Sequence, residues 1–197
     1  MNVQEFVNNV VDNLQDIILS LNPILGIVLG MLVIVTESML PVLPLGVFIT
    51  FNVLVFGNVL GFAMSWVATV IGCSLMFLFV RRFFQSYFRD KIKKNKKLKK
   101  IMERLDDISF SNLVLITSLP FTPAFLVNIA SGLSKMDFKK FFLHILISKF
   151  VIVYFWAYIG STFVKSVTDI FVIIRLSLLL IFAFILSKIV MKKQKID

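Results

Sequence analysis

Long apolar stretches, interrupted at a few polar positions, make up most of the chain. Three of them are long enough to cross a bilayer, since a spanning helix needs about 20 mainly apolar residues. They cover residues 59–80, 141–163 and 170–191. None alternates apolar and polar residues as a barrel strand does, so the pattern predicts an all-α polytopic membrane protein.

A shorter apolar stretch begins after Pro23 and is broken near its middle. It runs to Val35, meets the polar residues 36–38 and then Pro41 and Pro44, and resumes over residues 45–55. Neither half reaches the length of a span. Short halves that meet at prolines indicate a discontinuous helix or a re-entrant hairpin, which a membrane tolerates only where protein or a polar cavity covers the open backbone.

A second broken stretch follows the same plan. Residues 112–119 meet Pro120 and Pro123, and a second half continues to Gly132. Because proline fits the first turn of a helix, we expect the second halves of the two hairpins to begin near Leu45 and Ala124 with free backbone N–H groups. Such helix ends attract anions, including phosphate.

The two hairpins, each followed by a span, form a repeat. Pro41 and Pro120 are 79 residues apart, as are Pro44 and Pro123. If all basic segments lie on one side of the membrane, the span 59–80 runs toward that side and the span 141–163 runs away from it. We therefore predict two inverted repeats, the architecture of alternating-access transporters, with a final C-terminal transmembrane helix.

The chain begins with a segment of a different kind. Residues 3–19 place apolar side chains at three- and four-residue spacing opposite Asn, Asp and Gln, which is typical of an amphipathic helix on a membrane surface. It lacks the cationic region of a signal peptide, so we expect it to be retained. The expected organisation is a surface helix over 1–22, a membrane domain over 23–191 (repeat one 24–83, basic loop 81–107, repeat two 109–163, last helix 170–191) and a basic tail over 192–197.

Composition agrees with this picture. Hydrophobic residues make up 58% of the chain and charged residues 16%, whereas soluble domains average about 45–50% and about 25%. The net charge of +10 is concentrated in residues 81–104, so we expect no nucleic-acid partner, which would need a basic face on a soluble fold. By the positive-inside rule this loop and the C-terminus should be cytoplasmic, and the loop can also attract anionic headgroups. The candidates for these roles are Arg81, Arg82, Lys93, Lys94, Lys96 and Lys97.

The chain offers little for catalysis. Cys73 and His144 are the single cysteine and histidine, so the sequence supplies neither a zinc-type ligand set nor a nucleophile–base pair. We expect both to be packing residues, and we predict a protein that is not an enzyme and has no metal or cofactor. Trp156 is expected near a membrane interface, as aromatic-belt residues are.

Glu37 is the one acidic residue inside an apolar stretch. A charge at the bilayer centre costs about 2.5–3.5 kcal/mol or more, so it usually faces a partner or a cavity; the alternative is a solvated cap near the interface. Lys149 is its natural partner by depth, unless it snorkels to the surface. The residues predicted to form a transport site are Glu37, Pro41, Pro44, Asn52, Pro120, Pro123, Asn128, Gly132 and Lys149.

These segments resemble the signatures of the DedA superfamily, also called the SNARE-associated Golgi protein or VTT-domain family. Residues 37–44 carry an acidic residue shortly before two prolines, and Leu119 to Pro123 followed by Asn128 to Leu133 is similar to the second signature. The segment 57–81 looks like the family's glycine-rich first span and its basic exit. The resemblance covers roughly residues 25–165.

The resemblance implies a lipid transporter of the flippase or scramblase type, some relatives being coupled to an ion or proton gradient. Bacterial relatives suggest a polyprenyl phosphate or an anionic glycerophospholipid as the substrate, and a bacterial plasma membrane as the location. Many relatives carry an arginine three residues before the second-hairpin proline, where this chain has Thr117. If that arginine serves the coupling, its replacement argues against proton-driven transport.

We therefore predict a transporter of a phosphate-bearing lipid that uses a cavity between the two hairpins. One alternative is a non-catalytic scaffold whose basic loop recruits a partner or anionic lipid. A less favoured one is a membrane enzyme acting on lipid phosphate, for which Glu37 has no His or Asp companion.

Overall fold

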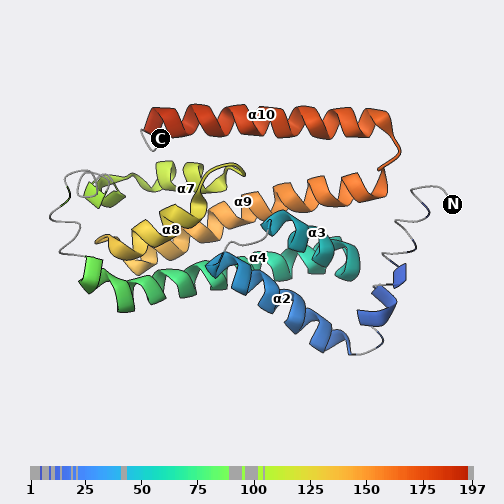
Figure 1. The fold of residues 1–197 in the computed structure, drawn as a ribbon, viewed down its shortest axis with the longest axis horizontal. Coiled ribbons are helices and arrows are strands. Elements are labelled where there is room, and N and C mark those ends of the chain that lie inside the picture. Colours follow the sequence, from blue (N-terminus) through green and yellow to red (C-terminus); the bar gives the residue numbers. More distant parts are fainter. Residues whose placement is uncertain are drawn as a thin grey trace.

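The structure is a computed structural model, and Figure 1 shows it as a ribbon with the longest axis horizontal. It describes residues 22–40, 44–88 and 105–194, together with single positions at 5, 9, 12, 13, 15–18, 20, 95, 102 and 103. The described positions between 5 and 20 are helical. The rest of the predicted N-terminal surface helix lies outside the described residues. The described part of the chain is helical without strands, as the sequence predicts.

The first hairpin consists of helices α2 (Pro23–Met39) and α3 (Leu45–Phe56). The side chain of Asn22 caps the start of α2, and Pro23 takes the first helical position, where its missing N–H costs nothing. Gly57 ends the hairpin with a φ of +82°, a conformation that glycine adopts without strain. The first half is longer than predicted, because α2 does not stop at Thr36 but continues for one more turn to Met39.

The second hairpin consists of helices α7 (Phe110–Ser118) and α8 (Ala124–Leu133). Ser109 caps α7 by accepting a hydrogen bond from the backbone N–H of Asn112. The tip between the helices is held by Thr122, whose hydroxyl donates to the carbonyls of Ile116 and Leu119 at 2.6 and 2.8 Å. Both second halves begin where the prolines predict, with Pro44 and Pro123 at the capping positions.

Three long helices complete the fold: α4 (Asn58–Phe79), α9 (Phe138–Lys165) and α10 (Ile170–Gln194). Helix α4 passes through a π-helical turn, η1 (Val80–Phe84), and the helical segment extends to residue 88. Among the described residues, these three helices are long and apolar enough to cross a membrane, with mean hydropathies of 2.0, 1.8 and 2.8. They correspond to the three spans expected from the sequence.

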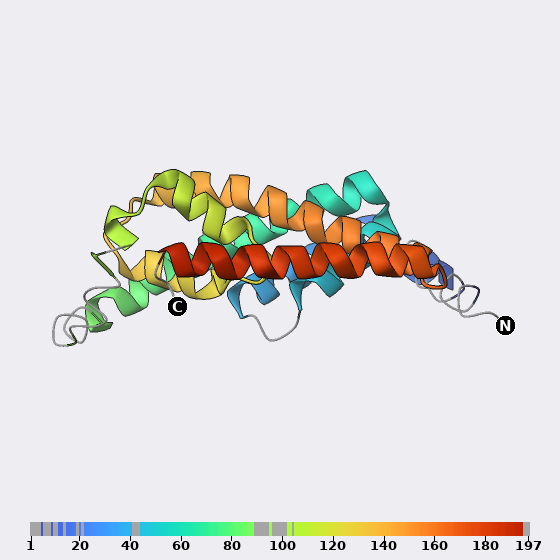
Figure 2. The same cartoon turned by 90° about the horizontal axis from the view of Figure 1, so that it is seen from above.

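The two hairpins enter the molecule from opposite ends. In Figure 1 the tip of α2 and α3 points into the middle from one side, and the tip of α7 and α8 points into the middle from the other. Helix α4 then runs from the first end to the second, and α9 runs back, so hairpin and span are inverted between the two halves. Helix α10 crosses once more and brings the C-terminus to the end opposite the N-terminus (Figures 1 and 2). We call the end that carries residues 84–88, residues 105–109 and the last turn of α10 the basic end, and the one with Gly57 and the turn 166–169 the far end.

Packing joins the halves crosswise. The first helix of each hairpin packs on the span of its own half, α2 on α4 and α7 on α9. The second helix packs on the span of the other half, α3 on α9 and α8 on α4, and α3 packs on α4 as well. One buried cluster, which includes Ile34, Val53 and Val153, joins α2, α3, α4 and α9. A second, built around Phe77, Leu113 and Phe141, joins α4, α7, α8 and α9.

Small residues on α4 allow the hairpin helices to approach closely. A Cβ on Gly61 would collide with the backbone of Asn52 in α3, and one on Gly72 would lie 2.7 Å from the carbonyl oxygen of Val35 in α2. Neither neighbour can yield, because both contacts are to backbone. Small residues at helix interfaces are typical of packing within a membrane, as the sequence of this span indicates.

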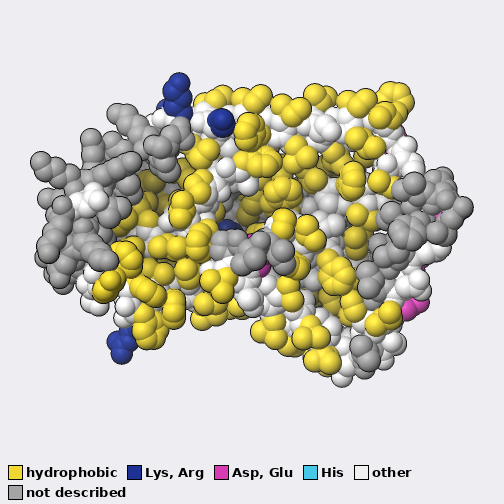
Figure 3. Space-filling view, viewed as in Figure 1, with side chains coloured by type: hydrophobic (Ala, Val, Ile, Leu, Met, Phe, Trp, Pro, Cys, Tyr) yellow, Lys and Arg dark blue, Asp and Glu magenta, His cyan; other side chains and the backbone are white. Residues whose placement is uncertain are grey.

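Apolar side chains cover the outside of the molecule. Figure 3 shows a mainly hydrophobic face over the long helices, with Lys and Arg side chains at the basic end. Helix α10 is the most lipid-exposed span, because only 17% of its apolar window is buried, compared with 56% for α4. This surface suits a hydrocarbon environment rather than water.

Candidate functional site

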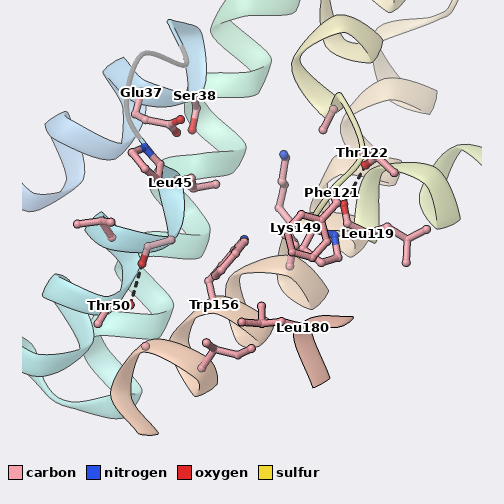
Figure 4. A pocket seen from close by; sticks show the side chains of 18 of the residues that line it. Glu37, Ser38, Leu45, Thr50, Leu119, Phe121, Thr122, Lys149, Trp156 and Leu180 are labelled. Atoms are coloured by element: carbon pink, nitrogen blue, oxygen red, sulfur yellow. Dashed lines mark hydrogen bonds between the residues drawn. The ribbon is translucent and has the colours of Figure 1, made fainter. Parts of the chain in front are cut away.

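A cavity of about 780 Å³ lies between the two hairpin tips and the helices α9 and α10. Figure 4 shows its centre, where Glu37 and Ser38 come from the first hairpin, Thr122 from the second, and Lys149 and Trp156 from α9. Its volume lies within the range of about 300–1,000 Å³ typical of small-molecule sites. The hairpin tips meet near the middle of the long axis in Figure 1, so the cavity lies about midway along the helices that are long enough to span a membrane.

Glu37 and Lys149 provide the charges of this cavity. Glu37 is 9% exposed and Lys149 is 6% exposed. They face each other across the cavity (Figure 4) and interact electrostatically through it. Buried charges at membrane depth are costly unless they face a partner, so each supplies the other's compensation. The structure thus places both residues in one cavity, with the Lys149 side chain buried.

The position of Glu37 within α2 adds to its energetic cost. It lies in the last turn of the helix, where the partial negative charge of the helix end disfavours a carboxylate. The cavity therefore holds an acidic group in an unfavourable place, opposite the basic group that offsets it. Such an arrangement is typical of a functional site rather than of a core optimised for stability.

The helix ends at the tips were expected to supply positive potential. The N-termini of α3 and α8 do reach the cavity, where Pro44, Leu45, Pro123 and Ala124 line it, and no side chain caps either one. Each tip, however, also contains the C-terminus of the preceding helix, α2 or α7. Positive and negative helix ends of about half a charge each lie side by side and largely cancel. Lys149 is therefore the main positive charge of the site.

Uncharged polar groups surround the charged pair. Asn128 of α8 donates from Nδ2 to the sulfur of Cys73 at 3.2 Å, and both line the cavity. The Asn128 side-chain oxygen has no hydrogen-bond partner among the described residues. Thr117 of α7 also lines the cavity, although its hydroxyl already donates to the carbonyl of Leu113 at 2.8 Å. Each half of the molecule thus contributes polar atoms, and Asn128 keeps an acceptor available.

Two residues that the sequence suggested for the transport site lie elsewhere. Asn52 is buried between helices, where its amide donates to Ser65 Oγ at 3.2 Å and to the carbonyl of Gly30 at 3.4 Å. Gly132 packs against Phe77 and Val80, where a Cβ would come within 3.0 Å of the Phe77 carbonyl oxygen. Neither lines the cavity. Both hold hairpin helices against α4, because a short polar group or a missing side chain is needed there.

The remaining transport candidates divide between the cavity and the undescribed part of the chain. Glu37, Pro44, Pro120, Pro123, Asn128 and Lys149 all line the cavity. Pro41 lies outside the described residues, and so do Lys93, Lys94, Lys96 and Lys97 of the basic loop.

Arg81 is engaged in a network at the basic end. Its guanidinium donates to the carbonyls of Ser134 and Met136 at 3.0 and 2.7 Å, and more weakly to those of Ser131 and Gly132. It also stacks over the Phe77 ring, 4.3 Å from the centroid. We call these contacts the Arg81 clamp; they tie the end of α4 to the end of α8. The neighbouring Arg82 is exposed.

The sequence did not single out several residues that line the cavity. Trp156, expected at a membrane interface, forms part of the wall beside Leu180 (Figure 4). Cys73, expected to pack, is buried and also reaches the cavity. For an apolar or weakly polar residue in a span, the sequence can indicate only that the side chain is buried. Whether the side chain faces a cavity depends on how the helices assemble. His144 is fully buried, with its ring 5.0 Å from that of Phe141.

Comparison with known proteins gives three matches. A family model described as the VTT domain matches residues 43–162. The chain is 33% identical over 135 residues to the uncharacterized membrane protein YhjE of Bacillus subtilis (strain 168), an alignment covering 68% of this chain and 65% of that protein. It is 24% identical over 124 residues to the uncharacterized protein YqeD of the same organism, covering 63% of this chain and 60% of that protein. The chain thus spans less than two thirds of the length of either relative. No solved structure matches.

Proposed function

Because the chain belongs to the VTT-domain family, also called the DedA family, of membrane proteins, we propose that it moves a phosphate-bearing lipid across the bilayer. The observation that carries this proposal is the cavity at mid-membrane depth, between two hairpins that enter from opposite ends. A transporter needs a polar site that a headgroup can reach from either side, and discontinuous helices at the interface of inverted repeats provide one.

The charges of the cavity favour an anionic headgroup. Lys149 offers three N–H donors on a positive charge. The starts of α3 and α8 also reach the cavity and have no side-chain cap, although the first N–H of α8, that of Ala124, already donates to the Thr122 carbonyl at 2.7 Å. Phosphate oxygens accept both kinds of hydrogen bond. The polyprenyl phosphate or anionic glycerophospholipid suggested by the family resemblance has this chemistry.

Glu37 sets the condition under which the headgroup binds. An ionised carboxylate repels phosphate, and at low effective dielectric the repulsion amounts to several kcal/mol. In the proposed cycle Glu37 is either paired with Lys149 or protonated when the phosphate is bound. Transport therefore becomes pH-sensitive even though Thr117 stands where many relatives have an arginine.

The proposal includes an orientation. The basic end carries Arg82, Lys135, Lys139 and the last turn of α10 with Lys192 and Lys193. Under the positive-inside rule this end faces the cytoplasm of a bacterial plasma membrane. The far end and its turn 166–169 then face outward.

The test is reconstitution into liposomes with labelled lipids, with and without an imposed proton gradient. Labelled phosphatidic acid and phosphatidylcholine of identical chains are compared in the same assay. Lys149→Met removes the charge and keeps much of the length, and we expect it to lower phosphatidic acid transport by about tenfold or more, since a lost charge-assisted hydrogen bond costs about 1.5–3 kcal/mol.

Lys188→Met is the matched control, because Lys188 is an exposed lysine of α10 whose ammonium lies 5.2 Å from the Phe184 ring and not in the cavity. It should leave transport unchanged. If Lys149→Met transports both lipids at the wild-type rate, or if the wild type transports neither, the proposal fails. In the second case a scaffold that recruits a partner through its basic loop becomes the better explanation.

A further inference from the structure

The cavity has an apolar half that headgroup binding does not require. It extends from the charged centre along α3, α9 and α10 toward the far end. The residues that form this half, which we call the chain slot, are Leu45, Ile152, Trp156, Ile159, Leu176 and Leu180. The slot continues directly from Lys149, so one cavity contains a polar centre and an apolar extension.

The slot continues in one direction only. Toward the far end the lining continues along α9 to Phe163 and Val164 and along α10 to Ile173. Toward the basic end the lining goes no further along α9 than Lys149, and beyond it the Phe77 ring of α4 stacks on the Phe141 ring of α9 at 4.2 Å. Along α9 and α10 the cavity of this structure is thus extended toward the far end.

Aromatic rings form the junction between the slot and the second hairpin. Phe121, at the hairpin tip, lies 6.3 Å from the ring of Trp156 in α9 and 5.6 Å from that of Phe184 in α10, in edge-to-face geometry in both cases. Trp156 also contacts Gly46 of α3, where a Cβ would lie 2.8 Å from the indole. Trp156 therefore lies between the two hairpins and borders the slot.

We propose that the chain slot binds a hydrocarbon chain of the lipid whose phosphate occupies the centre, and that this lipid enters from the leaflet at the far end. The inference rests on the proposed function and adds to it the place of the chain and the leaflet of entry. The ligand is therefore an amphiphile with a phosphate at one end and at least one apolar chain.

Energetics indicate what the slot contributes. Moving a methylene group from bilayer to slot gains almost nothing, because lipid tails are as apolar as leucine side chains. Leaving the same group exposed to water at the charged centre would be unfavourable, because apolar surface is driven out of water. The slot therefore lets the headgroup reach mid-membrane depth while its chain stays in apolar surroundings.

Trp156 makes the slot observable. In a Trp66→Phe variant it is the single tryptophan, so its fluorescence reports on this wall alone. The probe is phosphatidic acid brominated near the middle of its chains, added at increasing mole fraction to vesicles of unbrominated phosphatidylcholine. Bromine quenches indole only on close contact. We expect quenching that saturates at a low mole fraction and is reversed by unbrominated phosphatidic acid.

Two substitutions of the same kind provide the control. Leu180→Phe narrows the slot beside Trp156 (Figure 4), whereas Leu178→Phe places the same ring on the lipid-facing side of α10, where Leu178 is 62% exposed. We expect Leu180→Phe to weaken the apparent affinity of the saturable quenching by at least fivefold, equivalent to about 1 kcal/mol. Leu178→Phe should match the parent.

The outcomes separate this inference from the proposed function. If quenching grows linearly with the brominated fraction, or is equal in both leucine variants, the slot does not bind the chain, while transport dependent on Lys149 can still stand. If brominated lipid confined to the leaflet of the basic end quenches as well as lipid confined to the far end, the leaflet of entry is wrong. Saturable quenching without transport would contradict the proposed function alone.

Discussion

Residues of the same charge lie in different surroundings in this protein. Arg81 and Arg82 are adjacent, yet the first donates hydrogen bonds to backbone carbonyls at the end of α8 and the second is exposed. Glu37 is buried in the cavity, and Asp169 caps the start of α10 by accepting from the backbone N–H of Phe171. Each pair allows a substitution to be tested against a matched control.

Glu37→Gln keeps the shape of the side chain and removes its charge. Because an ionised Glu37 opposes a bound phosphate, we expect wild-type transport of phosphatidic acid to rise as the pH falls. The variant should transport at a rate that is independent of pH and about tenfold higher at neutral pH, the equivalent of about 1.4 kcal/mol of relieved repulsion. The measurement is the initial rate in liposomes from mildly acidic to neutral pH. As the control, Asp169→Asn keeps a side chain that can cap α10 and should behave as the wild type. A pH dependence that persists in Glu37→Gln would show that the Glu37 carboxylate does not oppose the bound phosphate.

Arg81→Lys tests the Arg81 clamp. Lysine keeps the charge but lacks the planar fork that reaches several carbonyls at once. With hydrogen bonds to charged groups contributing about 1.5–3 kcal/mol each, we expect the variant to lose about 2 kcal/mol of unfolding free energy. This loss should appear as a lower Tm in detergent. Arg82→Lys, on an exposed side chain, should leave the Tm unaltered, and equal effects of the two substitutions would contradict the assignment.

At the scale of helices, much of the fold could be predicted from the sequence. The three spans, the two broken segments and the starts of the second halves follow from apolar length and from proline positions, because a bilayer restricts which backbones are allowed. The end of α2 was not predicted, since Glu37 and Ser38 break the apolar pattern without breaking the helix. A polar residue within an apolar helix therefore does not by itself mark the end of that helix.

The site was predicted less completely than the fold, for a related reason. Glu37 and Lys149 are conspicuous because charges in apolar stretches are rare. Asn52 and Asn128 occupy similar places in the sequence, yet one packs inside and the other lines the cavity. The assembly of the helices decides which face of a short apolar helix points toward the cavity. The sequence of that helix alone does not show it. For the same reason the sequence does not indicate that Trp156 faces the cavity.

Gly61→Ala tests the close contact between α3 and α4. The added methyl would collide with the Asn52 backbone, and overpacking of this kind typically costs about 1–3 kcal/mol. We expect a lower Tm and reduced transport. Gly26→Ala is the comparison, since its Cβ would meet side-chain atoms of Ile18 and Phe56 rather than backbone, so we expect it to cost less than Gly61→Ala. A Gly61→Ala protein as stable as Gly26→Ala would show that the helices do not pack as described.

For the whole molecule, the inverted arrangement and the distribution of basic residues give one topology to test. In a Cys73→Ser background, Lys139→Cys lies at the basic end and Thr168→Cys at the far end, and both positions are exposed. An impermeant maleimide added to intact cells should label Thr168→Cys alone, and Lys139→Cys should react only after permeabilisation. Labelling of Lys139→Cys from outside would reverse the orientation, and labelling of both would refute the three crossings.

The crosswise packing of the two halves has a consequence for how the protein is made. Helix α3 needs α9 as a neighbour, and α9 is translated about 80 residues later at a ribosome that adds about 5–20 residues per second. For several seconds the nascent first hairpin therefore lacks one of the helices on which it packs. We expect the first half to reach its final packing only after the second half has been inserted, as a late step in the biogenesis of this membrane protein.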